Sequence, residues 1–439
     1  MNRQSAPFAA SVVMLLLTSA CAGDDDGARA SGAPTVVGVS GPALPLVAPD
    51  EAGLSEEALA LITPAMQEHV TAGRLPGVVT LVALGGRIVH WQAIGMRDIE
   101  AADPLEPDDI FRIYSMTKPV TSVAIMMLVE DGRVGLDDLV SHHLPAFADL
   151  SVLEEDGSRT PMSPPMTIRH LLSHNGGLTY GIFGDTPVDR AYMSSGLFAA
   201  QSLPEYVGIV AGLPLAAQPG ERWNYSVSTD VLGYIVEIAS GQSFAEFLEE
   251  RILQPLGMDD TAFWVPEAKR DRFTTHYAGS EDGLAVVDSP AEGRFTQAPG
   301  LASGGGGLVS TASDYVRFAQ MMLQDGQLDG VRILRSETVQ EMRRNQLSES
   351  AVPIALAGWF PPAYGFGLGF ATLIDHEATP EADHDGVFRW GGVANTFFWI
   401  DPEAELIAMV WTQMDPFLVH GLERQFQALV YSALGPDAE

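Results

Sequence analysis

Apolar residues near the start of the folded part of the chain change from a helical period to a strand period. Residues 54–72 carry apolar side chains at helical spacing, and residues 78–84 and 87–93 are rich in β-branched and aromatic types. Gly85 and Gly86 separate the two β-rich segments and predict a tight hairpin turn with positive φ. The folded body therefore begins with a helix followed by two antiparallel strands.

The other end of the chain repeats this arrangement in reverse order. Residues 395–400 and 406–411 are β-branched and aromatic, and a turn-forming Asp-Pro-Glu sequence at 401–403 lies between them. Helical spacing at 418–434 follows. Two strand pairs and two terminal helices predict one antiparallel sheet to which both ends of the chain contribute.

The middle of the chain, about 131–298, has few convincing strands. It contains apolar runs at helical spacing, interrupted by Gly and Pro, at 167–173, 203–211 and 227–239. We therefore expect an α/β (α+β) fold, in which an antiparallel sheet is flanked by terminal helices and interrupted by a mostly helical inserted domain. The expected domains are an α/β domain at 47–130 and 299–439 and a helical domain at 131–298.

Residues 1–20 have the form of a secretory signal peptide. One arginine precedes an uncharged apolar stretch that is too short to span a membrane stably, and small residues follow. The sequence at 17–21 (Leu-Thr-Ser-Ala-Cys) resembles a bacterial lipobox, in which Cys21 becomes the lipidated first residue; cleavage by an ordinary signal peptidase is the alternative. Residues 21–46 are rich in Gly, Ala, Ser, Asp and Pro and predict a disordered tether. We expect a secreted cell-envelope lipoprotein, held at the membrane only through Cys21.

Composition excludes several classes of function. The 439 residues include 57 acidic and 24 basic side chains, a formal charge of −33, and a surface this negative repels phosphate backbones, so nucleic-acid binding is excluded. The single cysteine, Cys21, excludes intrachain disulfides and multi-cysteine zinc or iron–sulfur sites. His170 and His174 have the i, i+4 spacing of metal ligands, but no HExxH glutamate accompanies them. Structural roles are therefore favoured for both histidines, and no metal or cofactor is expected.

Lysine is almost absent from this chain. Lys118 and Lys269 are the two lysines, which leaves 22 arginines among the 24 basic residues. Arginine serves surface charge as well as lysine does, but it cannot lose its proton at usable pH. A position that needs a neutral amine base must therefore be lysine. Lys118 stands three residues after Ser115 in an SxxK sequence.

Residues after Ser115 predict a helix that has the serine at its N-terminus. Apolar residues follow helical spacing, Pro119 fits a first turn, and Gly132 can end the helix. A separation of three places the Ser115 hydroxyl and the Lys118 amine on one face, and both the helix dipole and burial disfavour the ammonium form. A neutral Lys118 could then accept the proton of Ser115. The alternative is an N-cap serine followed by a solvated lysine.

Two further segments supply candidate site residues. Tyr225 lies on a loop made rigid by Pro219, where its phenol could relay protons. Trp390, Gly391 and Gly392 precede a predicted strand, and the two glycines would let the backbone approach a ligand closely. Taken singly, a packed tyrosine and a β-bulge are the alternative interpretations.

These motifs resemble those of a known superfamily. In order along the chain they are Ser115-Met116-Thr117-Lys118, Tyr225-Ser226 and Trp390-Gly391-Gly392. They resemble the serine β-lactamase and penicillin-binding-protein superfamily, and most closely the family VIII carboxylesterases beside the class C β-lactamases. Segments 167–178, 256–258 and 303–308 are also similar to the family, so the likeness covers about 54–434. The resemblance implies a β-lactamase/transpeptidase-like fold.

The resemblance also implies a role for each motif residue. Ser115 is the expected nucleophile, Lys118 its base, and Tyr225 a partner in proton transfer to and from the leaving group. The backbone N–H groups of Ser115 and Val393 are expected to form the oxyanion hole, with residues 390–392 contributing to substrate binding.

Two positions depart from the β-lactamase pattern. Val227 stands where class C enzymes carry asparagine. Trp390 stands where β-lactamases and peptidases carry a basic residue that grips a substrate carboxylate, unless Arg389 substitutes for it. The expected function is therefore a serine hydrolase that cleaves small carboxylic esters through an acyl-enzyme. The alternatives are a β-lactam or amide hydrolase, a DD-peptidase-like cell-wall enzyme, and a weakly catalytic penicillin-binding-like sensor. The sequence leaves the oligomeric state open.

Overall fold

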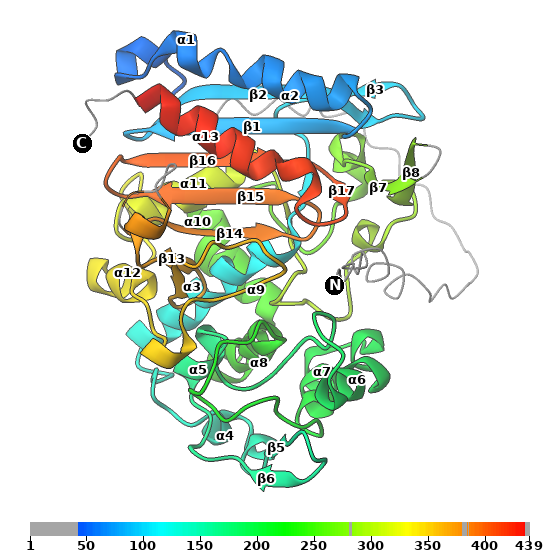
Figure 1. Ribbon diagram of the computed structural model, residues 1–439, viewed down its shortest axis with the longest axis vertical. Coiled ribbons are helices and arrows are strands. Elements are labelled where there is room, and N and C mark those ends of the chain that lie inside the picture. Colours follow the sequence, from blue (N-terminus) through cyan, green and yellow to red (C-terminus); the bar gives the residue numbers. More distant parts are fainter. Residues whose placement is uncertain (1–42, 281–282, 380–383, 385, 435–439) are drawn as a thin grey trace, which may run out of the picture.

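The computed structural model describes residues 43–280, 283–379, 384 and 386–434 (Figure 1). Within these residues, eight strands form one antiparallel sheet in the order β12-β13-β14-β15-β16-β1-β2-β3. Its strands are β1 (Gly77–Leu84), β2 (Arg87–Asp98), β3 (Asp103–Pro104), β12 (Tyr364–Phe366), β13 (Ala371–Leu373), β14 (Phe388–Gly392), β15 (Thr396–Asp401) and β16 (Leu406–Trp411). The α/β fold class with an antiparallel sheet is confirmed.

The two ends of the chain meet in the middle of this sheet. β1 pairs with β16, and Val79 lies opposite Trp411. The hairpin between β1 and β2 turns at Gly85 and Gly86, whose φ angles are 55° and 77°. These angles favour glycine and explain why the two residues interrupt the β-rich pattern.

Helices cover both faces of the sheet. α1 (Glu56–Leu59), α2 (Ile62–Thr71) and α13 (Leu422–Leu434) pack together on one face, and Figure 1 shows α13 in front of the strands. On the other face, α11 (Ala312–Leu323) packs against β15 and β16, and α3 (Thr117–Glu130) lies below it in the figure. The terminal helices expected from the apolar spacing are confirmed, with the first divided into α1 and α2.

The helical part of the chain occupies the lower half of Figure 1. The helices expected at 167–173, 203–211 and 227–239 are confirmed as α5 (Ile168–Leu172), α7 (Leu203–Val210) and α8 (Ser228–Ser240). The same part of the chain also forms α4 (Val140–His143), α6 (Pro187–Ser194), α9 (Phe244–Leu248), α10 (Gln254–Leu256), β5 (Ser151–Leu153) and β6 (Arg159–Pro161), and Figure 1 labels α10 at the level of the large sheet. Elsewhere, β4 (Phe111–Arg112) pairs with β9 (Val309–Ser310), β10 (Gln327–Leu328) pairs with β11 (Val331–Arg332), and α12 (Ser336–Arg343) follows.

Several short strand pairs were not expected from the sequence, and one of them joins the helical region to a C-terminal segment. β7 (His276–Ser280) and β8 (Gly283–Asp288) pair with each other, and β7 also pairs with β17 (Met414–Asp415). Much of both strands is exposed, so they lack the apolar alternation that identifies a half-buried strand. Residues expected in the helical region therefore join a small sheet with a C-terminal segment.

The first described residues lie against β2. The Ile88 N–H donates to the Pro45 carbonyl at 2.8 Å, and Leu44 is buried. Residues 43–46 therefore belong to the folded body, although their composition placed them in the tether, because one buried leucine leaves little mark on composition. The expected signal peptide and Cys21 lie outside the described residues. None of the helices that the structure describes is long and apolar enough to cross a membrane.

Candidate active site

Ser115 lies in a short 3-10 turn, Tyr114–Met116, that leads directly into α3. Tyr114 has a positive φ of 40°, which is rare for an aromatic residue and shows that the backbone is strained beside the serine. The Tyr315 hydroxyl on α11 donates to the Met116 carbonyl at 2.9 Å and holds this turn. Every side chain in the first three turns of α3 is buried, whereas Ser115 itself is partly exposed. The turn therefore presents Ser115 at the end of a helix fixed in the core.

Lys118 is fully buried in the first turn of α3. Its Nζ lies 3.1 Å from Ser115 Oγ and donates a hydrogen bond to the Gly305 carbonyl at 2.6 Å. Burial lowers the pKa of Lys118 to about 7, and the Asp230 carboxylate opposes this change. A large fraction of the amine is then neutral near pH 7. Its lone pair can face Ser115 while an N–H remains bonded to Gly305.

Asp230, in the first turn of α8, holds the glycine-rich segment 303–307 beside the Lys118 amine. One Asp230 oxygen accepts hydrogen bonds from the Ser303 hydroxyl at 2.5 Å and from the Gly305 N–H at 3.0 Å. A β-carbon at residue 305 would lie 2.5 Å from the Asp230 carboxylate and 2.7 Å from the Tyr180 hydroxyl. Only glycine fits there, so the backbone of the glycine run at 304–307 approaches the Asp230 carboxylate closely at Gly305.

Tyr225 lies almost buried on the loop before α8. Lys118 Nζ lies 4.6 Å from the centre of its ring. Burial raises the pKa of Tyr225 above its usual value, while the nearby Ser115 hydroxyl and Trp390 indole act in the opposite direction. The Trp390 N–H falls short of hydrogen-bond geometry, so its effect is that of a nearby dipole. Tyr225 is therefore a protonated phenol that faces the serine.

Aromatic rings surround Tyr225. The Trp390 ring centre lies 5.3 Å from that of Tyr225 and 5.2 Å from that of Phe366. Phe183 precedes α6, is 51% exposed, and lies 5.7 Å from Tyr225. The position where related β-lactamases are expected to carry a cation is therefore occupied by a buried indole in an aromatic cluster.

The segment 390–392 forms the end of β14 and pairs with β15. It therefore belongs to a strand, and is not only a segment that precedes one. A β-carbon at Gly392 would lie 2.4 Å from the carbonyl oxygen of Ile113. The backbone at the end of β14 therefore lies against the backbone that leads to Ser115. Val393, which follows, is 41% exposed.

Arg389 is engaged away from the serine. Its guanidinium forms a buried ion pair with Glu423 on α13 and lies 3.3 Å from the Tyr364 hydroxyl. Alternation along β14 places neighbouring side chains on opposite faces of the sheet. Arg389 therefore does not supply the cation that Trp390 replaces.

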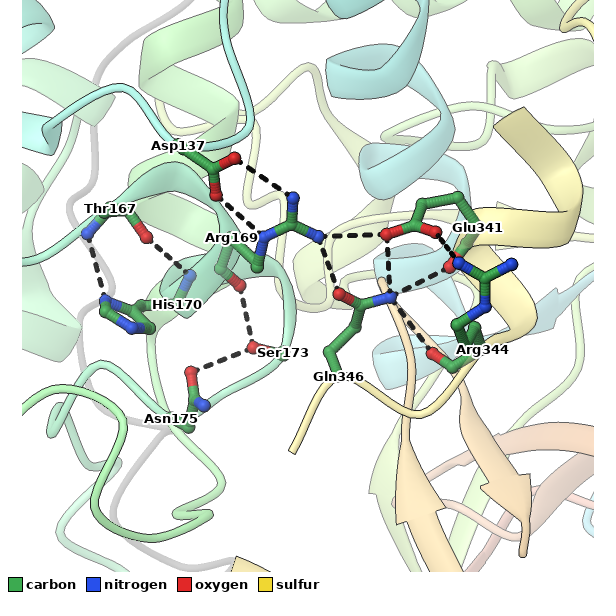
Figure 2. A network of polar contacts seen from close by, with 9 residues as sticks. All are labelled: Asp137, Thr167, Arg169, His170, Ser173, Asn175, Glu341, Arg344 and Gln346. Carbon is green, nitrogen blue, oxygen red and sulfur yellow. Dashed lines mark hydrogen bonds and ion pairs between the residues drawn. The ribbon is translucent and has the colours of Figure 1, made fainter. Parts of the chain in front are cut away.

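His170 and His174 both use a ring nitrogen in a contact within the fold. His170 Nδ1 accepts from the Thr167 N–H at 3.2 Å and completes the cap of α5 (Figure 2). His174 Nδ1 lies 3.0 Å from the Ser226 hydroxyl. These contacts agree with the structural roles expected from the sequence. Among the described residues, no group of three or more His, Cys, Asp and Glu side chains is arranged to hold a metal ion.

The structure brings Ser115, Lys118, Tyr225 and Trp390 together from three separate segments of the chain. The sequence interpretation missed Asp230, which lies behind the lysine. An aspartate in the first turn of a helix is common near a cap, so its position carried no chemical signal. Asp230 binds Ser303 and Gly305 in the segment 303–308, whose similarity to the family was the one available signal.

Comparison with known proteins identifies the family. The Beta-lactamase family profile matches residues 61–431. Protein Rv1367c of Mycobacterium tuberculosis (strain ATCC 25618 / H37Rv) is 36% identical over 361 residues, which cover 80% of this chain and 89% of that protein. Esterase EstB of Burkholderia gladioli is 32% identical over 382 residues, which cover 83% of this chain and 91% of that protein.

A solved structure has the same fold. EstCE1, described as a hydrolase with promiscuous acyltransferase activity, matches with a TM-score of 0.73 at 28% identity, covering 85% of this chain and 99% of that one. The β-lactamase/transpeptidase-like architecture expected from the motifs is confirmed. The chain belongs to the Beta-lactamase family, and it is an enzyme of the serine hydrolase class.

Proposed function

We propose that this enzyme cleaves uncharged carboxylic esters through an acyl-enzyme on Ser115. The observation that carries the proposal is the fully buried Lys118 amine, 3.1 Å from Ser115 Oγ and with its pKa lowered to about 7. A surface lysine would stay protonated and could not act as a base. Desolvation of Lys118 supplies a neutral amine beside the hydroxyl.

In the proposed reaction, Lys118 takes the proton of Ser115 as Oγ attacks the ester carbonyl. The N–H groups of Ser115 and Val393 stabilise the oxyanion. Tyr225 donates its proton to the departing alkoxide and recovers one from Lys118, which leaves the amine neutral and the serine acylated. A water molecule then attacks the acyl carbon and gives one proton to the same groups. The acyl–Oγ bond breaks, Ser115 Oγ takes up that proton, and the carboxylic acid leaves.

The surroundings of Trp390 support a neutral substrate. A carboxylate placed against this indole loses hydration without gaining a charge-assisted hydrogen bond, which is worth roughly 1.5–3 kcal/mol. Arg389 is held by Glu423 and lies away from the site. The formal charge of −33 adds a repulsive, salt-dependent force on anionic substrates.

We also propose that the enzyme is exported and anchored in the cell envelope through a lipid on Cys21. The lipobox-like sequence before Cys21 and the acidic, small-residue segment after it support this proposal. Residues 22–42, between Cys21 and the described residues, are rich in Gly, Ala, Ser and Asp, a composition typical of a flexible tether.

The test is a panel of p-nitrophenyl esters of increasing acyl length, assayed beside a chromogenic cephalosporin. We expect the best neutral ester to exceed the cephalosporin by at least about a hundredfold in kcat/KM, equivalent to roughly 2.7 kcal/mol in transition-state binding. A cephalosporin hydrolysed as efficiently as the esters would overturn the ester proposal and favour a β-lactamase. Acylation without turnover of any substrate would favour a penicillin-binding-like sensor.

A further inference from the structure

His174 holds the residues on both sides of Tyr225. Its backbone carbonyl accepts a hydrogen bond from the Asn224 N–H at 2.8 Å, and its ring Nδ1 lies 3.0 Å from the Ser226 hydroxyl. The Ser226 hydroxyl lies a further 2.7 Å from that of Ser228, the first residue of α8. One buried residue therefore ties the tyrosine loop before and after the tyrosine itself.

The His174 ring also packs against Tyr225. The two ring centres lie 5.1 Å apart, and Phe366 and Trp223 contact the other sides of the imidazole at 5.4 and 6.4 Å. His174 is 1% exposed and has a positive φ of 53°, which is uncommon for a residue other than glycine. Such a conformation persists where the surrounding contacts fix it, and it is common at functional sites.

The segment that carries His174 is itself anchored, as Figure 2 shows. Arg169 on α5 donates to Asp137 at 2.9 Å, to Glu341 at 3.0 Å and to Gln346 at 2.7 Å. The Ser173 hydroxyl donates back to the Arg169 carbonyl at 2.7 Å. The first turn of α5 is thus fixed to α12, and the Ser173 hydroxyl ties the residue before His174 to that turn.

We propose that His174 is a positioning residue, which fixes the Tyr225 phenol within reach of the leaving group through its bonds to Asn224 and Ser226. This inference rests on the proposed function, in which Tyr225 transfers the leaving-group proton. The tyrosine loop has no helix or strand geometry of its own at residue 225. Without His174 the phenol would lose its fixed place, and a displacement of about 1 Å can cost a hundredfold in rate.

The imidazole acts as a neutral group. Burial lowers the pKa of His174 well below its usual value, and the positive charge of protonated Lys118 acts in the same direction. His174 therefore positions Tyr225 through hydrogen bonds and ring packing and takes no part in proton transfer.

The test compares His174→Asn with His174→Gly. Both residue types accept a positive φ, so the difference between the two variants reports the side chain and not the backbone. Asparagine keeps a polar atom at the position of Nδ1. We expect His174→Gly to lower kcat at least about tenfold with KM nearly unchanged, and His174→Asn to recover most of that loss. His90→Asn is the matched control. His90 lies on β2, and its Nε2 also contacts a hydroxyl, that of Thr80 on β1, at 2.8 Å.

A double-mutant cycle with Tyr225→Phe separates positioning from general stability. If His174 acts through the phenol, His174→Gly has no further effect on the residual rate of Tyr225→Phe. An equal loss in both backgrounds, or full kcat in His174→Gly, would show that the inference is wrong. Full activity in Tyr225→Phe alone would instead overturn the proposed function. If His174→Gly does not fold, Ser226→Ala removes the hydroxyl that contacts the ring. This variant must then lower kcat in the wild-type background and have no further effect in Tyr225→Phe.

Discussion

Arg389 and Trp390 are neighbours on β14, yet their side chains serve opposite faces of the sheet. Arg389 pairs with Glu423 on α13, whereas Trp390 packs against Tyr225 at the candidate active site. Because neighbouring side chains on a strand point to opposite faces, a basic residue at position 389 faces away from the candidate site, whereas position 390 faces it. In this chain the Arg389 guanidinium forms a buried ion pair, and the Trp390 indole lies at the candidate active site.

Substitution of Arg389 separates these two roles. Arg389→Met should lower the free energy of unfolding by about 3–5 kcal/mol, because it leaves the buried Glu423 carboxylate without its partner. The ratio of ester to cephalosporin turnover should not change. Urea unfolding and the two assays check both parts, and Arg389→Met combined with Glu423→Leu should recover much of the stability. A selective loss of cephalosporin turnover in Arg389→Met would mean that the guanidinium does reach the substrate.

Lys118→Arg tests the need for a neutral amine. Arginine keeps the approximate reach of the side chain but stays protonated and cannot accept a proton near neutral pH, so we expect kcat to fall at least about a hundredfold. In the wild-type enzyme, kcat/KM should fall as the pH drops through about 7, because the lowered pKa of Lys118 means that the amine becomes protonated there. Stopped-flow ester hydrolysis between pH 5 and 9 measures this acidic limb of the pH profile of kcat/KM. Near-normal activity in Lys118→Arg would reduce Lys118 to a structural role.

Asp230→Asn should shift that pH limb. The Asp230 carboxylate raises the pKa of Lys118, so its neutral replacement should lower the pKa further and move the acidic limb to lower pH. Asparagine can still accept from Ser303 and Gly305, which limits the loss of kcat. A pH profile of kcat/KM for this variant measures the shift. A limb that moves to higher pH, or does not move, would contradict the electrostatic coupling.

Cys21→Ala tests the anchor. In a bacterial host the full-length wild-type protein should partition into detergent, and the variant should appear in the aqueous phase or stall before cleavage. Mass analysis of the mature N-terminus decides the outcome. Cleavage at any position other than before Cys21 would leave a plain secreted enzyme.

Much of the sheet could be predicted because its strands are strongly patterned. The segments that form β1, β2, β15 and β16 are rich in β-branched and aromatic residues, and Gly85 and Gly86 need the positive φ that their turn has. The pair β7–β8 could not be found in this way, since its side chains are largely exposed and follow no period. Residues 43–46 were assigned to the tether because a single buried leucine does not alter local composition.

Local sequence patterns likewise predicted one part of the candidate site and not the rest. Ser115 and Lys118 are three residues apart on one helix, so local spacing alone placed them together. Asp230 is far from Lys118 in sequence, and only the folded chain brings its carboxylate close to the lysine and to the glycine segment at 303–307, a relation that no local spacing encodes. The direction of Arg389 depended on the register of β14 against β15, which is a property of the whole sheet.

The most direct test of this account is covalent labelling by a p-nitrophenyl phosphonate, followed by peptide mass spectrometry. A phosphonate reacts with an activated serine and mimics the acylation step, so the account predicts one adduct, on Ser115, with loss of ester turnover in proportion to labelling. Ser115→Ala should be neither labelled nor active. An adduct on any other serine, or ester turnover that survives complete labelling of Ser115, would contradict the assignment of the nucleophile and with it the proposed function.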